Sequence, residues 1–136
     1  MAATREYDGV CVRVVDGDTL VLRLTHTFTQ EVDFGFYVKD SVSLTKTAEV
    51  SFRLFGVNAP ETHGPTKARG EAAKAALEEL VTGVPLRVVS YKPDKYGRGL
   101  ADLYAKGSNG FEVHVNHILI ATGHALPWNG TGLKPV

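Results

Sequence analysis

Three short segments of this sequence carry side chains that could act on a phosphodiester. Residues 16–19 (DGDT) place two carboxylates on a tight turn, residues 52–62 (FRLFGVNAPET) hold an arginine and a carboxylate, and residues 94–99 (DKYGRG) add a lysine and another arginine. Planar guanidinium groups can each meet two phosphate oxygens as the transition state gains negative charge. A carboxylate can take a proton from attacking water, and oxygen ligands can hold a hard divalent cation. This inventory suits hydrolysis of a phosphodiester.

Arg53 most needs an explanation, because it lies among apolar neighbours in a segment with strand propensity. A desolvated guanidinium is costly unless an anion meets it, so we expect a negative group beside it. Taken singly, each segment also has a structural explanation. The DGDT turn could be an ordinary hairpin, and Arg53 could face solvent. Glu61 could cap the following helix, and Arg98 could simply follow a turn.

The elements that must position these groups follow from the pattern of apolar residues and turn signals. We expect strands at residues 7–15, 19–25, 49–57, 86–91 and 100–105, and helices at residues 68–80 and 115–122. Gly83 and Gly123 stand where the two helices should end. Five strands with a helix before the last two predict a mainly β (α+β) protein, a five-stranded oligonucleotide/oligosaccharide-binding (OB) barrel with two helices. For the chemistry above, that barrel must bring the three segments into one pocket.

Residues 27–48 do not fit the compact barrel. They are rich in Thr, Phe and Val and contain no proline, which predicts a β-hairpin arm inserted between the second and third core strands. Aromatic residues such as Phe28 and Tyr37 leave two sharper alternatives for this arm, a dimer contact or a nucleic-acid clamp. The whole chain, residues 1–136, is expected to form one domain, with oligomeric state left open.

Charge and composition narrow the class of partner. Fifteen basic and fifteen acidic residues give a formal net charge of zero, so any anion must be recognised by locally placed arginines and lysines. No apolar stretch approaches the roughly twenty residues that cross a bilayer, so we expect no membrane partner. The N-terminal segment does not have the pattern of a signal peptide, which favours a cytoplasmic location, with secretion after cleavage of a leader as the alternative.

Three blocks occur in a specific order: residues 14–22 (VVDGDTLVL), residues 52–62 and residues 94–107 (DKYGRGLADLYAKG). In this the sequence resembles the staphylococcal nuclease (thermonuclease) family. Residues 70–80 and 115–125 are similar to that family's first two helices. The resemblance implies an OB barrel and a calcium-dependent endonuclease that hydrolyses DNA and RNA, preferably single-stranded, with little sequence preference.

The resemblance also implies roles for residues at the matching positions. Arg53 and Arg98 would grip the scissile phosphate, and Glu61 would act as the general base that activates water. Lys95 and Tyr96 would contact a neighbouring phosphate of the nucleotide.

For the metal, the resemblance implies Asp18 as a direct calcium ligand, with Asp16 supporting the ion indirectly. The family's second metal carboxylate is Asn58 here, so the direct ligands would be one carboxylate, one amide oxygen and the backbone carbonyl of Ala59. Fewer formal charges should weaken calcium binding or shift the preference toward magnesium or manganese.

Two other functions stay open on the sequence. The chain could be a catalytically weak or inactive OB module that binds single-stranded nucleic acid or a protein partner. It could also be a structural protein that assembles through the arm. Trp128 lies in the segment where the family has nucleotide-facing tyrosines, and it could stack on a base or serve packing alone.

Overall fold

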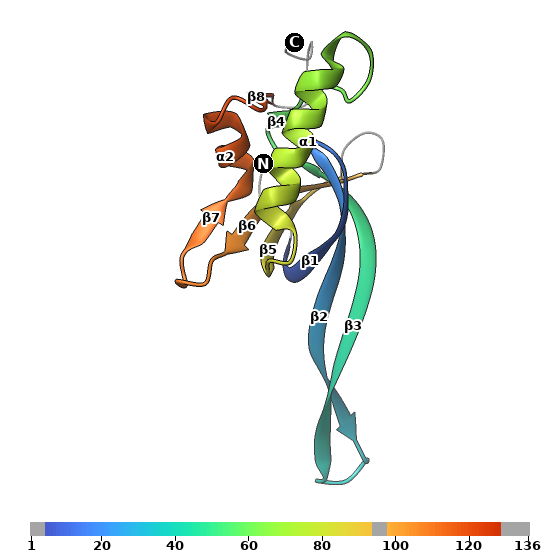
Figure 1. The fold of residues 1–136 in the computed structure, drawn as a ribbon. Coiled ribbons are helices and arrows are strands. Elements are labelled where there is room, and N and C mark those ends of the chain that lie inside the picture. Colours follow the sequence, from blue (N-terminus) through green and yellow to red (C-terminus); the bar gives the residue numbers. More distant parts are fainter. Residues whose placement is uncertain (1–4, 94–97, 129–136) are drawn as a thin grey trace.

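The computed structural model describes residues 5–93 and 98–128, and its main strands close into a barrel (Figure 1). The barrel strands are β1 (Arg5–Asp16), β2 (Thr19–Asp33), β3 (Lys39–Leu54), β5 (Leu86–Tyr91) and β6 (Gly99–Lys106). Neighbours in the order β3-β2-β1-β5-β6 pair antiparallel, and a parallel pairing of β3 with β6 completes the ring. This closure confirms the predicted OB-type barrel.

Strand β1 contains two β-bulges that bend it around the barrel. Its pairing with β2 shifts register twice, between Cys11 and Arg13 and again between Val14 and Asp16. Each shift leaves an extra residue on β1, and such bulges bend a strand and increase its twist. The bent strand can therefore pair with β2 along one part of its length and with β5 along another.

The core follows the two periodicities that the sequence predicted. Leu20, Leu22 and Leu24 alternate into the barrel from β2, as expected for a strand with one buried face. The helix α1 (Lys67–Val81) buries Ala73, Leu77 and Val81 at a spacing of four residues, which is one face of a helix. Beyond β6, the chain forms a short strand, β7 (Glu112–His114), which leads directly into α2 (Val115–Ala121). Both helices lie within two residues of their predicted bounds.

One predicted boundary is wrong, because the third core strand ends at Leu54 rather than at Val57. Gly56, with a φ of 76°, turns the chain just after the strand, a conformation that glycine adopts without steric cost. The chain then forms a separate short strand, β4 (Val57–Asn58). It pairs with β8 (Leu126–Pro127) near the end of the described chain.

The polar side chain of Asn116 joins α2 to the barrel. Its Oδ1 accepts a hydrogen bond from the backbone N–H of Leu103 at 3.0 Å. Its Nδ2 donates to the carbonyl oxygens of Phe55 at 2.9 Å and Ala101 at 3.0 Å. Asn116 is buried, so these three bonds satisfy a polar group that would otherwise be costly to desolvate. They hold α2 beside the exit of β3.

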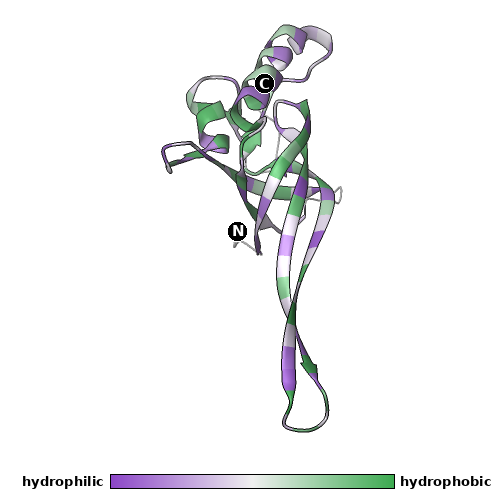
Figure 2. Cartoon of the chain, turned by 60° about the horizontal axis from the view of Figure 1, so that its bottom comes forward, coloured by the Kyte–Doolittle hydropathy of each residue, from purple (hydrophilic) through white to green (hydrophobic). Residues whose placement is uncertain are grey.

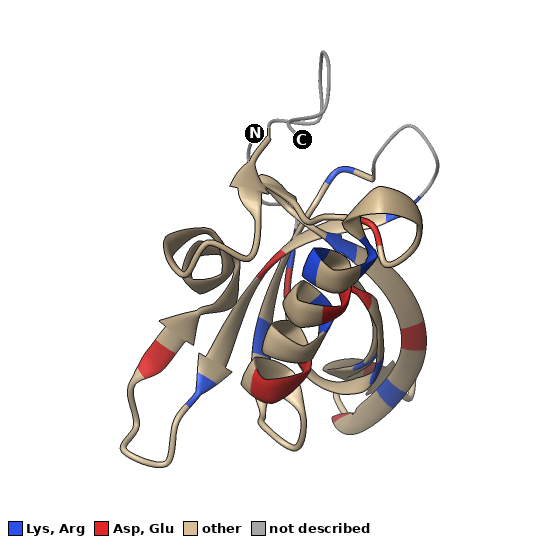
Figure 3. Cartoon of the chain, turned by 45° about the horizontal axis from the view of Figure 1, so that its top comes forward, with Lys and Arg blue, Asp and Glu red and all other residues tan. Residues whose placement is uncertain are grey.

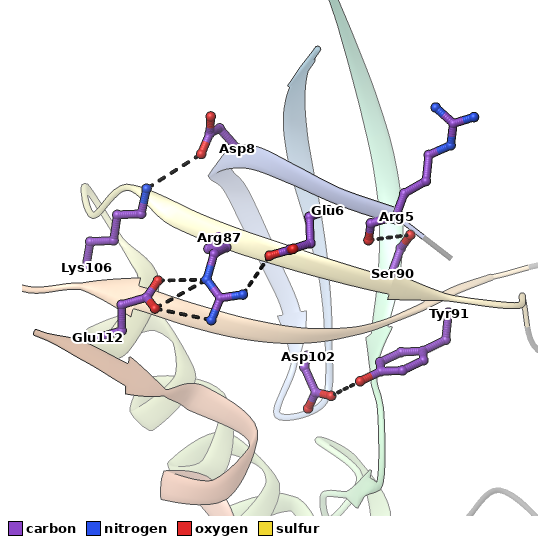
Figure 4. Close-up of polar contacts among 9 residues, drawn as sticks. All are labelled: Arg5, Glu6, Asp8, Arg87, Ser90, Tyr91, Asp102, Lys106 and Glu112. Carbon is purple, nitrogen blue, oxygen red and sulfur yellow. Dashed lines mark hydrogen bonds and ion pairs between the residues drawn. The ribbon is translucent and has the colours of Figure 1, made fainter. Parts of the chain in front are cut away.

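An ion-pair network fastens β1, β5 and β7 on the outside of the barrel (Figure 4). Arg87 donates from Nη1 to Glu6 at 2.6 Å, and from Nε and Nη2 to the carboxylate of Glu112 at 2.9 and 3.2 Å. The same guanidinium lies 4.1 Å from the ring centroid of Tyr104. The hydrogen bonds from Arg87 lower the pKa of Glu112.

Beyond the barrel, β2 and β3 continue as the predicted arm, residues 27–48, which extends away from the rest of the molecule (Figure 1). Their antiparallel pairing runs without interruption from Thr27 opposite Thr45 to Asp33 opposite Lys39. Among the described strands, only these two pair along the arm. In the same described part of the chain, no helix has the length and apolar character needed to span a membrane.

Candidate active site

One cavity of about 590 Å³ gathers the segments that the sequence singled out. The proposed site residues that line it are Asp16, Asp18, Arg53, Asn58, Ala59, Glu61 and Arg98. Barrel closure explains the convergence, since it sets the β1–β2 turn and the exit of β3 beside the start of β6. Lys95 and Tyr96 lie outside the described residues.

Asp18 is a rigidly held carboxylate in this cavity. Its Oδ1 accepts a hydrogen bond from Thr19 Oγ1 at 3.0 Å, and its Oδ2 accepts one from the backbone N–H of Ala59 at 2.9 Å. Its backbone N–H donates to Asp16 Oδ1 at 3.1 Å. Burial, together with the hydrogen bonding and charge of Asp18, raises the pKa of Asp16 to about 6. The turn therefore concentrates negative charge that a cation would relieve.

Two glycines allow the parts of the site to approach one another. A Cβ on Gly17 would lie 2.7 Å from the Cβ atoms of Ala59 and Ala73, so the turn packs tightly against the β3 exit and α1. A Cβ on Gly70 would overlap the carbonyl of Glu61. A helix-interior glycine usually costs about 1 kcal/mol relative to alanine. Here it allows α1 to pack directly on the backbone that carries the Glu61 carboxylate.

Arg53 is the expected buried arginine, and it is 5% exposed. Its Nη2 lies 3.8 Å from Asp18 Oδ2, too long for a hydrogen bond, and this buried nitrogen has no hydrogen-bond partner among the described residues. The guanidinium carbon lies 4.7 Å from the ring centroid of Trp128. A buried guanidinium with an unmet donor is costly, and an anionic ligand in the cavity would satisfy it.

Glu61 lies at the solvent-facing rim of the cavity. Its side chain is 71% exposed, and its Oε2 lies 3.3 Å from Nε2 of His63. Its backbone carbonyl accepts a hydrogen bond from Thr66 Oγ1 at 3.0 Å. The backbone of Glu61 is therefore held by the start of the helical region, while its carboxylate faces water.

The cavity also includes residues that the sequence analysis did not predict. Arg69 lines it from the first turn of α1, and His124 lines it from the chain after α2. Figure 3 shows basic residues toward the start of α1. This helix has no acidic residue in its first turn and no basic residue in its last turn, opposite to the charge pattern that the helix dipole favours. Arg69 could not be chosen from sequence, because only the contact at Gly70 turns this end of α1 toward the cavity.

Oxygen donors for a metal ion are present among the residues that line the cavity. Asp16, Asp18 and Asn58 carry side-chain oxygens, and Ala59 carries a backbone carbonyl. The described residues contain no group of three His, Cys, Asp or Glu side chains arranged to hold a metal. An all-oxygen set with two carboxylates suits a hard divalent cation, held with little protein charge and with water in the other coordination positions. The residues therefore fit calcium or a similar ion, and they do not form a zinc-type cluster.

Such a barrel defines an OB-type domain, and its cavity gathers arginines and oxygen donors. The sequence model of the family described as "Staphylococcal nuclease homologue" matches residues 51–130, which is more than half of the chain. The chain therefore belongs to the staphylococcal nuclease family. The matched segment contains Arg53, Glu61 and Arg98, whereas the Asp16–Asp18 turn precedes it and joins the site through the fold.

Curated proteins resemble the chain over part of their length. The "Probable staphylococcal-like nuclease CAN1" of Oryza sativa subsp. japonica is 44% identical over 83 residues, which cover 61% of this chain and 23% of that protein. The "Uncharacterized 38.1 kDa protein" of Capnoides sempervirens is 42% identical over 55 residues, covering 40% of this chain and 15% of that protein. The chain thus spans less than a quarter of these relatives. At the level of the family, it is a nuclease-like domain.

Proposed function

We propose that this domain is a metal-dependent phosphodiesterase that cleaves DNA and RNA, preferably as single strands, with little sequence preference. One observation carries the proposal: a single cavity collects a buried arginine, a second arginine, a rim carboxylate and the oxygen donors of the turn. Each group alone has a structural explanation. Core packing does not explain why all of them line the same cavity. Phosphodiester hydrolysis uses all of them together.

The two arginines would hold the scissile phosphate. Arg53 is held in place by burial, and its unmet Nη2 is a donor with no competing hydrogen bond from a described residue. Arg98 is half-buried and lines the same cavity. A donor aimed at charge that develops in the transition state is commonly worth about a hundred- to a thousand-fold in rate. Both guanidiniums would favour the transition state over the substrate, because its oxygens carry more negative charge.

Glu61 would take the proton from the attacking water. A general base must have access to water and an unprotonated carboxylate, and the exposed rim position supplies the first of these. Gly70 would act as a positioning residue, because the close packing of α1 fixes the backbone of Glu61.

Calcium is the metal that we propose, with magnesium and manganese as alternatives. Asp18, Asn58 and the backbone of Ala59 would hold the ion, and Asp16 would support it. When bound, such an ion adds positive charge that neutralises and polarises the phosphate. Asn58 lowers the formal charge of this set, so binding should be weaker than in a site with a further carboxylate.

The test is cleavage of labelled single-stranded DNA and RNA by the purified full chain. Calcium, magnesium and manganese are added one at a time, with a chelator as the blank. We expect cleavage with at least one ion and none with the chelator. Arg98→Lys and Glu61→Gln should each lower the rate about a hundredfold or more while binding of the oligonucleotide persists.

Arg13→Ala is the matched control, because Arg13 is an exposed barrel arginine outside the cavity. It should leave the rate unchanged. Cleavage that is absent with all three ions, while the oligonucleotide still binds, would instead support the binding-module alternative. An increase in cleavage by Asn58→Asp would then locate the defect at the metal ligands.

A further inference from the structure

The arm carries an apolar face that the described residues leave uncovered. Phe28 lies directly opposite Leu44 in the hairpin register, and Val42 and Val32 share that face at two-residue spacing. These four side chains are 40%, 44%, 43% and 39% exposed, respectively. The tip adds further exposed apolar side chains: Phe34, Phe36, Tyr37 and Val38. Figure 2 shows apolar and polar residues in alternating bands along the arm.

The opposite face of the arm is polar, and several of its side chains interact with one another. The hydroxyls of Thr27 and Thr45 are hydrogen-bonded across the strands at 3.0 Å. Lys39 lies 3.5 Å from Glu31 and 4.0 Å from Asp33 at the far end. A sheet with one polar and one apolar face is typical of a sheet whose apolar side is covered by another layer. The residue pattern of the arm therefore predicts that another layer of protein packs on its apolar face only.

The charges of the arm indicate which kind of partner could provide that cover. Residues 27–48 contain three acidic and two basic residues, a net charge of −1. Affinity for a phosphate backbone depends on clustered lysine and arginine, so the arm does not suit a nucleic-acid clamp. A hairpin that inserted into a bilayer would also place its polar face in lipid. The desolvation of those polar groups would be costly, so the arm does not suit insertion into a membrane. The same face also carries Gln30, Asp40 and Lys46, whose two charges are opposite in sign. A protein surface with an apolar centre and few charges therefore fits best.

We propose that the partner is a second copy of this chain, with the two arms packed apolar face to apolar face. The face is complementary to itself, and two such layers would lie about 10 Å apart, as in other packed sheets. The need for a cover is physical, because an isolated two-stranded hairpin is only marginally stable in water. Dimerisation supplies the second layer without requiring any other protein.

The surface area of the chain agrees with this proposal. Its accessible surface is 8630 Å², whereas a compact chain of 14.7 kDa is expected to expose about 6,900 Å². The arm is the described segment that leaves the barrel. The excess, roughly 1,700 Å², belongs to the whole chain, and the arm contributes to it through its exposed apolar residues. An interface of standard size buries ~800 Å² from each partner.

Sedimentation of the full chain over a range of concentrations tests the proposal. We expect the molar mass to rise from 14.7 kDa toward twice that value as concentration increases. The double variant Phe28→Thr, Leu44→Thr places β-branched residues with high strand propensity at both positions but makes the apolar face more polar. It should raise the dissociation constant at least about tenfold. The matched control exchanges a cross-strand pair on the polar face, Thr29→Ser with Ser43→Thr, and should behave as the parent.

A second measurement keeps the proposal testable if the double variant folds poorly. In a Cys11→Ser background, cysteine is placed at neighbouring positions by Val42→Cys or Ser43→Cys, on opposite faces of the arm. Alkylation of the cysteine at position 42 should slow severalfold as protein concentration rises, whereas alkylation at position 43 should not change. Neither readout depends on cleavage, so the result is independent of the proposed nuclease activity.

Several outcomes would overturn the dimer. A chain that sediments as a monomer at every concentration would do so, as would equal alkylation at both positions. Flotation with neutral phosphatidylcholine vesicles, lost on Phe36→Ser with Tyr37→Ser in a chain that stays monomeric, would assign the arm to a membrane instead. Dimers that persist in the double variant and in a chain whose arm is shortened to a two-residue turn would place the contact elsewhere.

Discussion

The burial of Arg53 lowers the stability of the folded chain but suits its proposed role in binding phosphate. Its guanidinium is almost fully removed from water, yet one of its nitrogens has no hydrogen-bond partner in the described chain. What holds it there is a nearby carboxylate, Asp18, and the aromatic face of Trp128. The contact with the Trp128 ring uses no hydrogen-bond donor, and Nη2 remains available to a phosphate. Trp128 is thus a positioning residue in our proposal.

Trp128→Ala should lower kcat about tenfold in the cleavage assay, because Arg53 would lose the stack that orients it, a contact worth about 0.5–2 kcal/mol. Trp128→Phe keeps an aromatic face and should stay within about threefold of the parent. The two variants should differ in kcat more than in KM. A role in packing alone would instead lower the melting temperature of both variants and leave kcat unchanged.

At the scale of elements, α1 shows a similar conflict. Basic residues at its start oppose the helix dipole, and they lie at the end of the helix that faces the cavity. The packing of Gly70 against the Glu61 backbone brings this end of α1 to the site. The helix therefore gives up some intrinsic stability where positive charge could attract an anion.

Substitution of this helix end should separate stability from binding. Arg69→Glu should raise the free energy of unfolding by about 0.3–1 kcal/mol, because an acidic residue suits the start of a helix. The same variant should weaken binding of single-stranded DNA, since it replaces a cavity cation by an anion. Lys67→Glu is the control, because Lys67 is the exposed first residue of α1 and does not line the cavity. It should stabilise the chain similarly without loss of affinity, and equal losses in both variants would contradict a specific role for Arg69.

The ion pairs between strands should make stability depend on pH. The pKa of Glu112 in the folded chain is lowered from 4.5 by Arg87, so the contribution of this pair is present above pH 4.5. It is lost as the pH falls through the lowered folded pKa. Glu112→Gln should therefore be less stable than the parent near neutrality, and the gap should close in acid. Urea unfolding midpoints of the two proteins, measured from neutral to acidic pH, test this; a gap that is the same at every pH would contradict it.

At the scale of the whole molecule, the formal charge of zero means that long-range attraction contributes little to binding an anion. In our proposal, substrate would be held mainly by the arginines that line the cavity among the described residues, Arg53, Arg69 and Arg98. The arm adds no net positive charge, and its exposed apolar residues lie outside the barrel. Binding and assembly would therefore occupy separate parts of the molecule.

The salt dependence of binding should be shallow. Neutralising a single-strand phosphate contributes about −0.7 to the slope of log K against log salt, so three arginines predict a slope of about −2. Fluorescence anisotropy with a labelled oligonucleotide and the Glu61→Gln variant measures the slope without cleavage. Arg98→Ala should make it less negative by about 0.7. A slope several times steeper would mean that basic residues outside the cavity contact the nucleic acid.

Local structure could be predicted from the sequence because its causes are local. Alternating apolar residues predicted the barrel strands, helical spacing predicted both helices, and a run of β-formers without proline predicted the arm. The candidate residues Arg53 and Glu61 were also visible, since their types are unusual for their positions. The error at the end of β3 came from Gly56, because its positive φ turns the chain just after Leu54, before the predicted end at Val57.

The candidate site residues are brought together by tertiary contacts, which the sequence pattern does not specify. The parallel pairing of β3 with β6 sets Arg53 near Arg98, and no short-range pattern specifies that pairing. Arg69 joined the cavity only through the close packing at Gly70, and Trp128 reached Arg53 only through the pairing of β4 with β8. Residue type and spacing determine what each segment can form and what chemistry it can supply. Closure of the barrel determines proximity, because it depends on contacts between segments far apart along the chain.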